Sequence, residues 1–257
     1  MKKFIFATDL HFGFERRNGH KIPLHDMKAF NCMLAFAKDF KPDVFIVGGD
    51  FLDCGVISHH NHGKPGAVEG LKLIEDARAL RKAAIEPIES IVGKSGELVY
   101  IIANHEDWLT DLTDKIPALE GLIELKPLLN LSDQWKIIPQ GGAYKLGKLT
   151  FVHGDTIKGG EHVAKNAVVN YERSIRFGHH HTMQQYSKAS ALDYKNAKSG
   201  WAIPCLCTKS PKYGEGAPNR WVQGFNFGYI HEGGYFNDYV AVILDGRTFV
   251  HGKKYQG

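Results

Sequence analysis

The chain has 257 residues, 43% of them hydrophobic and 23% charged, and its formal net charge is +4. These values are ordinary for a globular protein of one large domain or two small ones, and the mild positive charge tolerates an anionic substrate without requiring one. No segment approaches the ~18 consecutive apolar residues of a membrane span, which argues against a membrane partner. The cysteines are too few and scattered for a disulfide framework, which indicates reduced thiols in a cytoplasmic protein. They are Cys32, Cys54, Cys205 and Cys207, and we interpret the last two as structural.

Three short apolar runs near the start of the chain share one design. They are KFIFATD, which ends at Asp9, DVFIVGGD, which ends at Asp50, and ELVYIIANHE, in which polar residues follow Ala103. Each run predicts a buried strand with polar residues at its C-terminal end. Helices are expected between them, over residues 24–40 and 67–92. This alternation predicts a largely parallel sheet with crossover helices, in which ligands gather beyond the C-terminal strand ends.

The remainder of the chain is typical of shorter strands and tighter turns. Residues 135–155 predict strands around hairpin turns, followed by a helix over 160–170 and a strand over 174–177. The last third predicts a second, more antiparallel sheet, and Asp245–Gly246 is a strong hairpin signal. Because no repeat, low-complexity tract or linker interrupts the chain, we expect one domain with two sheets.

Polar motifs follow the predicted strands in a regular order. They are D-x-H at Asp9, G-D-x-x-D at Asp50, N-H-E at Asn104, H-G at His153 and G-H-H-H at His179. Histidine is seldom collected in this way for packing, and it is the commonest protein ligand for transition metals. The order of motifs therefore indicates a metal site at the strand ends.

These motifs resemble those of the calcineurin-like metallophosphoesterase superfamily, whose pattern is D-x-H, G-D-x-x-D, G-N-H-[DE], H-G and G-H-x-H. The resemblance covers residues 4–185, and the remaining segment, 186–257, is assigned to the second sheet and a possible substrate region of the single domain 1–257. Within that segment, the stretch 200–225 is also similar to the tail of phage-encoded members. The resemblance implies a four-layer α-β-β-α sandwich of two mixed sheets, with a dinuclear metal site at the C-terminal strand ends.

The same resemblance implies the metal ligands. One ion would be held by Asp9, His11 and His181, and the other by Asn104, His153 and His179. Asp50 would bridge the two. Such ligands suit manganese, our first choice, as well as iron, zinc or nickel. Two cations ~3.5–4 Å apart can share a hydroxide for in-line attack and clamp the phosphoryl oxygens.

The resemblance also implies a pair of catalytic residues. His105 would contact the phosphate and protonate the leaving oxygen, and Asp53 would orient His105. An aspartate–histidine pair of this kind fixes the tautomer of the imidazole and favours its protonated form. Glu106 is interpreted as a capping or supporting residue rather than a ligand.

Departures from the family pattern leave the subfamily open. Cys54 stands where the phosphoprotein phosphatases have a phosphate-gripping arginine, and Asp53 stands where the repair nucleases tend to have histidine. The closing G-H-x-H, by contrast, is more like the nuclease and phosphodiesterase branches. Our first interpretation is an enzyme that hydrolyses phosphomonoesters or phosphodiesters, and the alternative is a DNA or RNA nuclease. A Ser/Thr protein phosphatase and a non-catalytic scaffold are less favoured.

Two further segments bear on the substrate. The segment 201–221 combines the cations Lys209, Lys212 and Arg220 with aromatic residues, which is typical of a groove for single-stranded nucleic acid or a nucleotide. Its equally weighted alternative is an insertion with Trp221 in the core. The loop with His59, His60 and His62 is interpreted as a surface loop in preference to a substrate contact.

Overall fold

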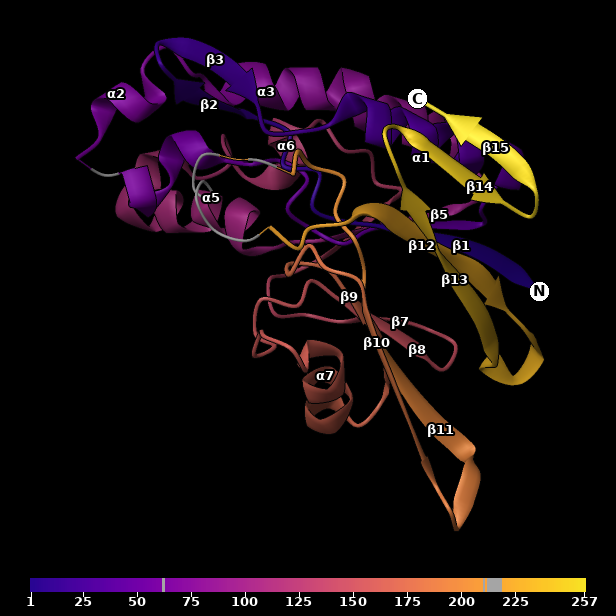
Figure 1. Ribbon diagram of the computed structural model, residues 1–257. Helices are drawn as coiled ribbons and strands as arrows, with labels where there is room; N and C mark the ends of the chain where they lie inside the picture. The colour runs from indigo at the N-terminus through magenta and orange to yellow at the C-terminus, as the bar shows by residue number, and fades with distance from the viewer. Residues whose placement is uncertain (62, 210, 212–218) are drawn as a thin grey trace.

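The molecule is built from two β-sheets packed face to face, with helices on the outer side of each (Figure 1). The computed structural model describes residues 1–61, 63–209, 211 and 219–257. Side chains alternate between the faces of a strand, so Phe4 and Phe6 pack between the sheets while Ile5 and Ala7 pack against the helices. The expected four-layer α-β-β-α sandwich is confirmed.

The first sheet is mixed and has six strands. Its order is β13 (Phe236–Ile243), β12 (Gln223–Ile230), β1 (Lys2–Ala7), β4 (Val44–Val47), β5 (Glu97–Ile101) and β6 (Trp135–Ile138). The strands β1, β4 and β5 run parallel, as the alternating strands and helices of the sequence predict. The strand β6, expected to belong to a hairpin, instead pairs in parallel with β5. The strand β12 is antiparallel to β1, and β13 is antiparallel to β12.

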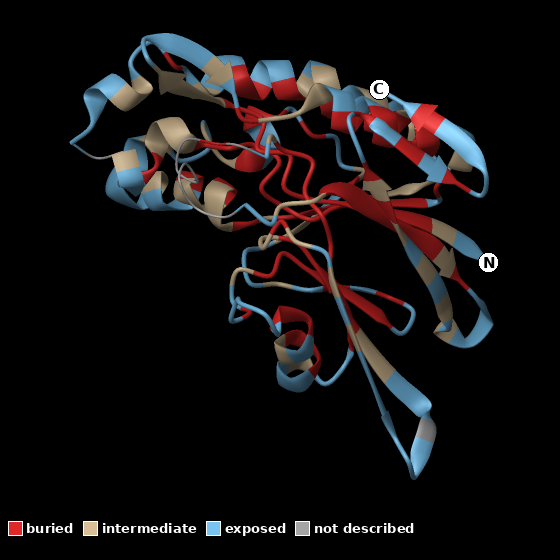
Figure 2. Cartoon of the chain, in the orientation of Figure 1, coloured by how far each residue is buried: buried red, intermediate tan, exposed pale blue. Residues whose placement is uncertain are grey.

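The second sheet is also mixed and has five strands. Its order is β10 (Gln184–Ser190), β11 (Asp193–Ala202), β9 (Ser174–Phe177), β8 (Leu149–Val152) and β7 (Tyr144–Leu146). The strands β8, β9 and β11 run parallel, so β8 and β9 end at the same edge of this sheet. The hairpin of β10 and β11 extends away from the rest of the molecule (Figure 1) and is largely exposed (Figure 2). Two small hairpins complete the strands: β2 (Phe14–Arg17) with β3 (His20–Pro23), and β14 (Arg247–Val250) with β15 (Lys253–Gln256).

The assignment of residues 186–257 to the second sheet is wrong in part. Among the described residues of this segment, only β10 and β11 join that sheet, whereas β12 and β13 extend the first sheet beyond β1. Without β12, the edge of β1 that faces away from β4 would expose unpaired backbone N–H and C=O groups. The strand β12 pairs with this edge, in a ladder from Lys2–Ile230 to Phe6–Asn226. The expected turn at Asp245–Gly246 is confirmed, since both residues have positive φ and Leu244 pairs with Arg247 across it.

The helices form the outer layers. The α-helices are α1 (Met27–Phe40), α2 (Pro65–Val68), α3 (Leu73–Leu80), α4 (Glu86–Val92), α5 (Asn104–Lys115), α6 (Leu125–Leu128) and α7 (Val163–Tyr171). Short 3₁₀ helices are η1 (Gly55–Ile57), η2 (His59–Asn61), η4 (Pro117–Leu119) and η6 (Glu232–Gly234). Among the described residues, α7 is the helix that packs against the outer face of the second sheet, and it does so through Val163 and Ala167. The helix α1 begins where the Asp26 carboxylate accepts hydrogen bonds from the backbone N–H groups of Lys28 and Ala29.

The helix expected over residues 67–92 is interrupted twice. Gly70 has a left-handed backbone conformation (φ +73°) and separates α2 from α3. Further on, residues Arg81–Ile85 form a π-helical turn, η3, in which Glu86 donates its backbone N–H to the carbonyl of Arg81. Pro87 follows at once and has no N–H to donate, so the α-helical hydrogen-bond ladder is broken at this point. Sequence pattern alone does not separate these pieces, because a roughly helical period of apolar residues runs across both breaks.

A buried ion pair joins the two sheets. Arg176 on β9 is 1% exposed, and its Nη2 donates to Oδ1 of Asp238 on β13 at 2.8 Å. The guanidinium also lies 4.2 Å from the ring centroid of Trp201, and the Asn226 amide donates to Asp238 at 2.9 Å. These contacts satisfy both charges and link strands of different sheets.

No helix in the described part of the chain has the length and apolar character needed to cross a membrane.

Replacing Arg176 with alanine should lower the free energy of unfolding by about 3–5 kcal/mol, because Asp238 would remain buried without its partner. Chemical denaturation measures the change. Arg173→Ala is the matched control, since Arg173 is exposed in the same region and its loss should cost less than about 0.5 kcal/mol. Equal effects of the two substitutions would contradict a structural role for the buried pair.

Candidate metal centre

Seven polar side chains meet where strands of both sheets end. They are Asp9, His11, Asp50, Asn104, His153, His179 and His181. Each follows the C-terminal end of β1, β4, β5, β8 or β9, and the buried loops that carry them run to the centre of the molecule in Figure 2. Ligands of parallel sheets collect at this edge. The structure therefore brings together all the residues that the motifs predict as ligands.

The backbone of these loops is strained in a way that aims the side chains. Five of the seven residues have φ between 48° and 66°: Asp9, His11, Asp50, His179 and His181. Such angles are uncommon outside glycine and mark functional sites. A backbone hydrogen bond of 2.8 Å from His11 to the carbonyl of Asp50 locks two of the loops together. Gly178 cannot carry a side chain, because a Cβ there would lie 2.4 Å from Oδ2 of Asp9.

The first group of donor atoms lies around His181. Its Nε2 is 3.2 Å from Oδ1 of Asp9 and 3.3 Å from Nε2 of His11. The same nitrogen of His11 is 3.7 Å from Oδ2 of Asp50. Asp9, His11 and Asp50 thus present one ligand atom each to a shared space.

The second group lies around His153. Its Nε2 is 3.1 Å from Oδ1 of Asn104, 3.2 Å from Nδ1 of His179 and 3.3 Å from Oδ2 of Asp50. Oδ2 of Asp50 therefore belongs to both groups. A carboxylate in that position is placed to bridge two cations.

The spacing and chemistry of these atoms fit divalent ions. Ligand atoms about 2.1 Å from one ion lie roughly 3.0–3.4 Å apart in octahedral or tetrahedral geometry, close to the distances within each group. Carboxylate, amide and imidazole donors together suit manganese, iron, zinc or nickel. The residues present therefore fit the pair of metals that the motifs imply.

Hydrogen-bond partners on the far side of the imidazoles set their orientation. Nδ1 of His153 lies 2.9 Å from the carbonyl of Gly48, and Nδ1 of His11 lies 3.1 Å from Oδ1 of Asp53. In each ring the opposite nitrogen, Nε2, then faces the shared space, which is how metal-ligating histidines are usually supported. Nδ1 of His181 has a weaker partner, the Cys207 thiol at 3.9 Å. Cys207 is thus placed behind a candidate ligand.

Two buried carboxylates of the site, those of Asp9 and Asp50, stay ionised. Burial raises the pKa of the Asp9 carboxyl, but the neighbouring His181 and His153 lower it overall to about 2. Burial likewise opposes ionisation of Asp50, whose pKa the surrounding imidazoles hold well below its usual range. In turn, burial lowers the pKa of His153, while Asp50 and Asp9 raise it to about 10. Buried carboxylates that stay ionised call for cations nearby, so the charge pattern favours metal binding.

The arrangement of Asp53 and His105 differs in detail from the expected pair. Nδ1 of His105 lies 2.6 Å from the backbone carbonyl of Asp53 and 3.3 Å from its Oδ1. The same Oδ1 is closer to His11, at 3.1 Å, a contact that the motif does not reveal. Burial lowers the pKa of His105, but Asp50 and Asp53 raise it to about 10. Asp53 therefore supports a candidate ligand and the candidate acid together.

Glu106 holds the two loops on either side of it. Its buried carboxylate accepts hydrogen bonds from the hydroxyl of Tyr100 and from four backbone N–H groups, those of Asp50, Phe51, Leu52 and Ala103. The small side chain of Ala103 matters here, because Gly49 approaches it so closely that a Cβ on Gly49 would lie 2.4 Å away. Ala103 stands where the family pattern G-N-H-[DE] has glycine, and its small side chain is compatible with the turn.

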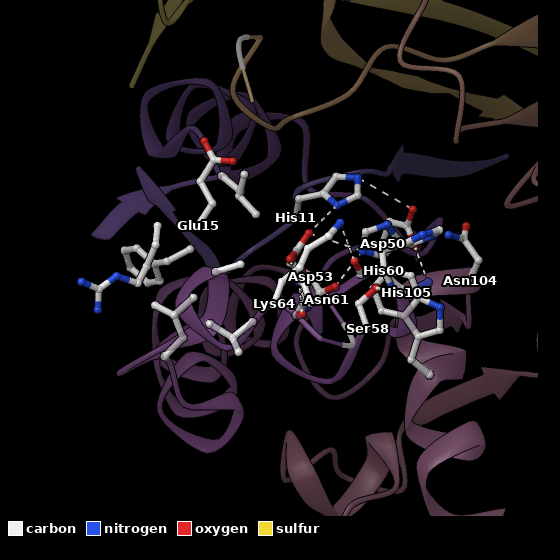
Figure 3. A pocket seen from close by; sticks show the side chains of 18 of the residues that line it. His11, Glu15, Asp50, Asp53, Ser58, His60, Asn61, Lys64, Asn104 and His105 are labelled. Carbon is white, nitrogen blue, oxygen red and sulfur yellow. Dashed lines mark hydrogen bonds and ion pairs between the residues drawn. The ribbon is translucent and has the colours of Figure 1, made fainter. Parts of the chain in front are cut away.

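A cavity of about 790 Å³ opens onto the metal groups. Its lining includes His105, His179, His181, Trp108 and Trp221 (Figure 3 shows most of its side chains). The proposed core position of Trp221 is wrong. Trp221 is half-buried at the wall of the cavity, and the centroid of its ring lies 4.1 Å from the ring centroid of His181.

The other residues predicted to touch substrate lie elsewhere. Lys209 and Arg220 are exposed and are not among the described residues that line the cavity, and Lys212 lies outside the described residues. His60 is exposed, as a surface loop predicts, yet it also lines the cavity, whereas His62 lies outside the described residues. Sequence reasoning missed Trp108. Its position three residues after His105 in a helix is a signal that could have found it, because such residues share a face.

The fold and the site define a metallophosphoesterase-like protein, and comparison with known proteins agrees. A family model for calcineurin-like phosphoesterases matches residues 2–232. The chain belongs to the calcineurin-like phosphoesterase family, as the motifs predict. The crystal structure of Vps29 from Chaetomium thermophilum is similar over 100% of this chain and 98% of its own, with 11% identity and a TM-score of 0.47. No protein of curated function matches the chain in sequence.

Glu106→Gln should lower the free energy of unfolding by about 3 kcal/mol. The amide NH₂ group of glutamine would face backbone N–H groups that now donate hydrogen bonds to the carboxylate, and two donors cannot pair. Tyr100→Phe removes only one of these hydrogen bonds and should cost about 1 kcal/mol. Thermal and chemical denaturation of both variants measure the difference. A Glu106→Gln variant as stable as Tyr100→Phe would show that the backbone contacts contribute little.

Proposed function

We propose that the chain is a dinuclear metal-dependent phosphoesterase that hydrolyses phosphate esters, with manganese as the first choice of metal. One observation carries this proposal. Oδ2 of Asp50 lies 3.7 Å from Nε2 of His11 in one group of donor atoms and 3.3 Å from Nε2 of His153 in the other. A single carboxylate oxygen shared by two groups of ligands is what two adjacent cations require.

The residues would divide between the two ions as the motifs imply. Asp9, His11 and His181 would hold one, Asn104, His153 and His179 would hold the other, and Asp50 would bridge them. When bound, such a pair of cations activates water and neutralises the charge of the phosphoryl oxygens. The neutral amide of Asn104 keeps the negative charge of the second group low, so that an anionic substrate is still attracted.

His105 would supply the proton that the reaction needs. Hydrolysis forms a bond between phosphorus and the oxygen of water and breaks the bond between phosphorus and the leaving oxygen, which must gain a proton. His105 lines the cavity, and Asp53 engages its Nδ1, which leaves Nε2 for the substrate. Against the effect of burial, Asp50 and Asp53 raise the pKa of this imidazole to about 10, which favours the protonated ring. A positioned acid of this kind contributes roughly 10²–10⁴-fold to the rate.

The cavity supports a small-molecule ester over a nucleic acid. Its volume of about 790 Å³ lies within the range of roughly 300–1,000 Å³ that is usual for small ligands. Lys209 and Arg220, which would contact a nucleic-acid backbone, are not among its described lining residues. A nuclease is therefore our second proposal. Turnover of a chromogenic aryl monoester and its bis-aryl diester, after loading with manganese, separates the two, because a clear diester preference favours the nuclease.

Asp50→Asn should remove metal-dependent hydrolysis, with a loss of more than about 100-fold, and should lower the metal content, since the charge shared by both groups is lost. Elemental analysis and the chromogenic assay measure both effects. Asp133→Asn is the matched control, because that carboxylate is exposed and bound to Lys126. Full activity of Asp50→Asn would refute the dinuclear proposal.

His105→Ala should lower kcat by about 10²–10⁴-fold while the metal content stays at the level of the unchanged chain. His162→Ala, which removes an exposed imidazole, is the control and should change neither quantity. Loss of metal from His105→Ala would instead mean that this histidine is a ligand, and its proposed role as the acid would be wrong.

A further inference from the structure

The cavity continues well beyond the metal groups. In Figure 3 the labelled side chains of Asp50, Asn104 and His105 gather at one end, whereas Glu15 lies at the other. A phosphoryl group with its ions occupies only the first end. The remaining space has no role in the hydrolysis proposed above, and the residues around it show what it would accept.

The walls of this second end are apolar. They come from the β2–β3 hairpin, the segment before α1, the helix α2 and the turn after it, and the residues are Phe14, Leu24, Ala67, Val68 and Leu71. Leu24 and Leu71 are 6% and 8% exposed, so the wall they form is part of the folded core. Such a surface gains free energy by removing an apolar group from water.

The charged residues at this end, and Lys64 between the two ends, are engaged by the protein itself. Glu15 forms an ion pair with Arg17. Arg16 donates to the backbone carbonyls of Glu69 and Gly19, at 2.7 Å and 3.0 Å. The Lys64 ammonium donates to the carbonyl of His60 at 3.1 Å. These contacts hold the loops around the space and do not build a pocket for a second anion. The space is therefore suited to an uncharged group.

Trp108 lines the cavity beside the candidate acid. Its ring centroid is 4.3 Å from that of His105, with the planes tilted by 35°, and 6.1 Å from that of His60. The cavity therefore has an aromatic wall next to His105. An indole next to an acid favours rings in the substrate, which stack on it or meet its edge.

We propose that this apolar end binds the leaving group of the substrate, and that the substrate class is phosphate esters of bulky, uncharged, ring-bearing alcohols. The inference rests on the proposed function, because it places the leaving oxygen beside His105. From there the rest of the alcohol can extend along the cavity toward Ala67 and Val68. A small aliphatic ester would leave most of the space empty and gain none of the burial.

Two aryl esters whose leaving phenols have similar acidity test the proposal, phenyl phosphate and 4-biphenylyl phosphate. The second differs by one more ring, which reaches further into the cavity. We expect its kcat/KM with the manganese-loaded chain to be at least about tenfold higher, the effect of burying a ring. Equal values for the two esters would overturn the inference and leave the phosphoesterase proposal standing.

Ala67→Trp tests where the extra ring binds. The new indole would fill the apolar end, so the preference for 4-biphenylyl phosphate over phenyl phosphate should fall to within about twofold of unity. Ala191→Trp, at the exposed tip of the β10–β11 hairpin, is the matched control and should keep the full preference. A preference that survives Ala67→Trp would place the ring elsewhere and overturn the inference.

Binding of the alcohol alone separates this inference from the function on which it rests. Calorimetry with 4-phenylphenol needs neither metal nor turnover, and it should show saturable binding at one site that Ala67→Trp abolishes and Ala191→Trp preserves. Absence of binding to the unchanged chain would overturn the inference whatever the activity. Binding without hydrolysis of either ester would instead support the apolar site and refute the proposed function.

Discussion

The buried carboxylate of Glu106 is the contact on which the candidate metal centre depends. It accepts hydrogen bonds from three consecutive backbone N–H groups, 50–52, and from Ala103, and so joins the loop after β4 to the start of α5. One loop carries Asp50 and the other carries Asn104 and His105. These hydrogen bonds stabilise the left-handed backbone of Asp50, because a residue with positive φ keeps that conformation only when its surroundings offset the strain.

The meeting of two sheets decides which side chains share the site. The first sheet contributes Asp9, His11, Asp50 and Asn104, and the second contributes His153, His179 and His181. Neither sheet alone holds a complete set for two ions. The ion pair of Arg176 and Asp238 and the apolar layer between the sheets fix their separation, so the packing that stabilises the fold also sets the distances between donor atoms.

The candidate ligands and the apolar walls of the cavity come from different parts of the fold. In the proposed function, the strand-end loops would supply the atoms that act on a phosphoryl group, whereas the β2–β3 hairpin and α2 would supply the walls that select what is attached to it. His105 and Trp108 lie on one helical face and belong to both parts. The reacting end follows the family pattern, and the selective end is built from connecting segments, where proteins of one fold differ most.

The sequence by itself determined the parallel strands, the order of the ligand motifs and the turn at Asp245–Gly246. These features are local: a strand, the polar residues after it and a two-residue turn are read within about ten positions. Only the tertiary structure decided that β12 pairs with β1, that Asp53 contacts His11, and that Trp221 and α2 line one cavity. Those contacts join residues far apart in the chain, and they depend on how the sheets and helices pack, which residue pattern alone does not specify.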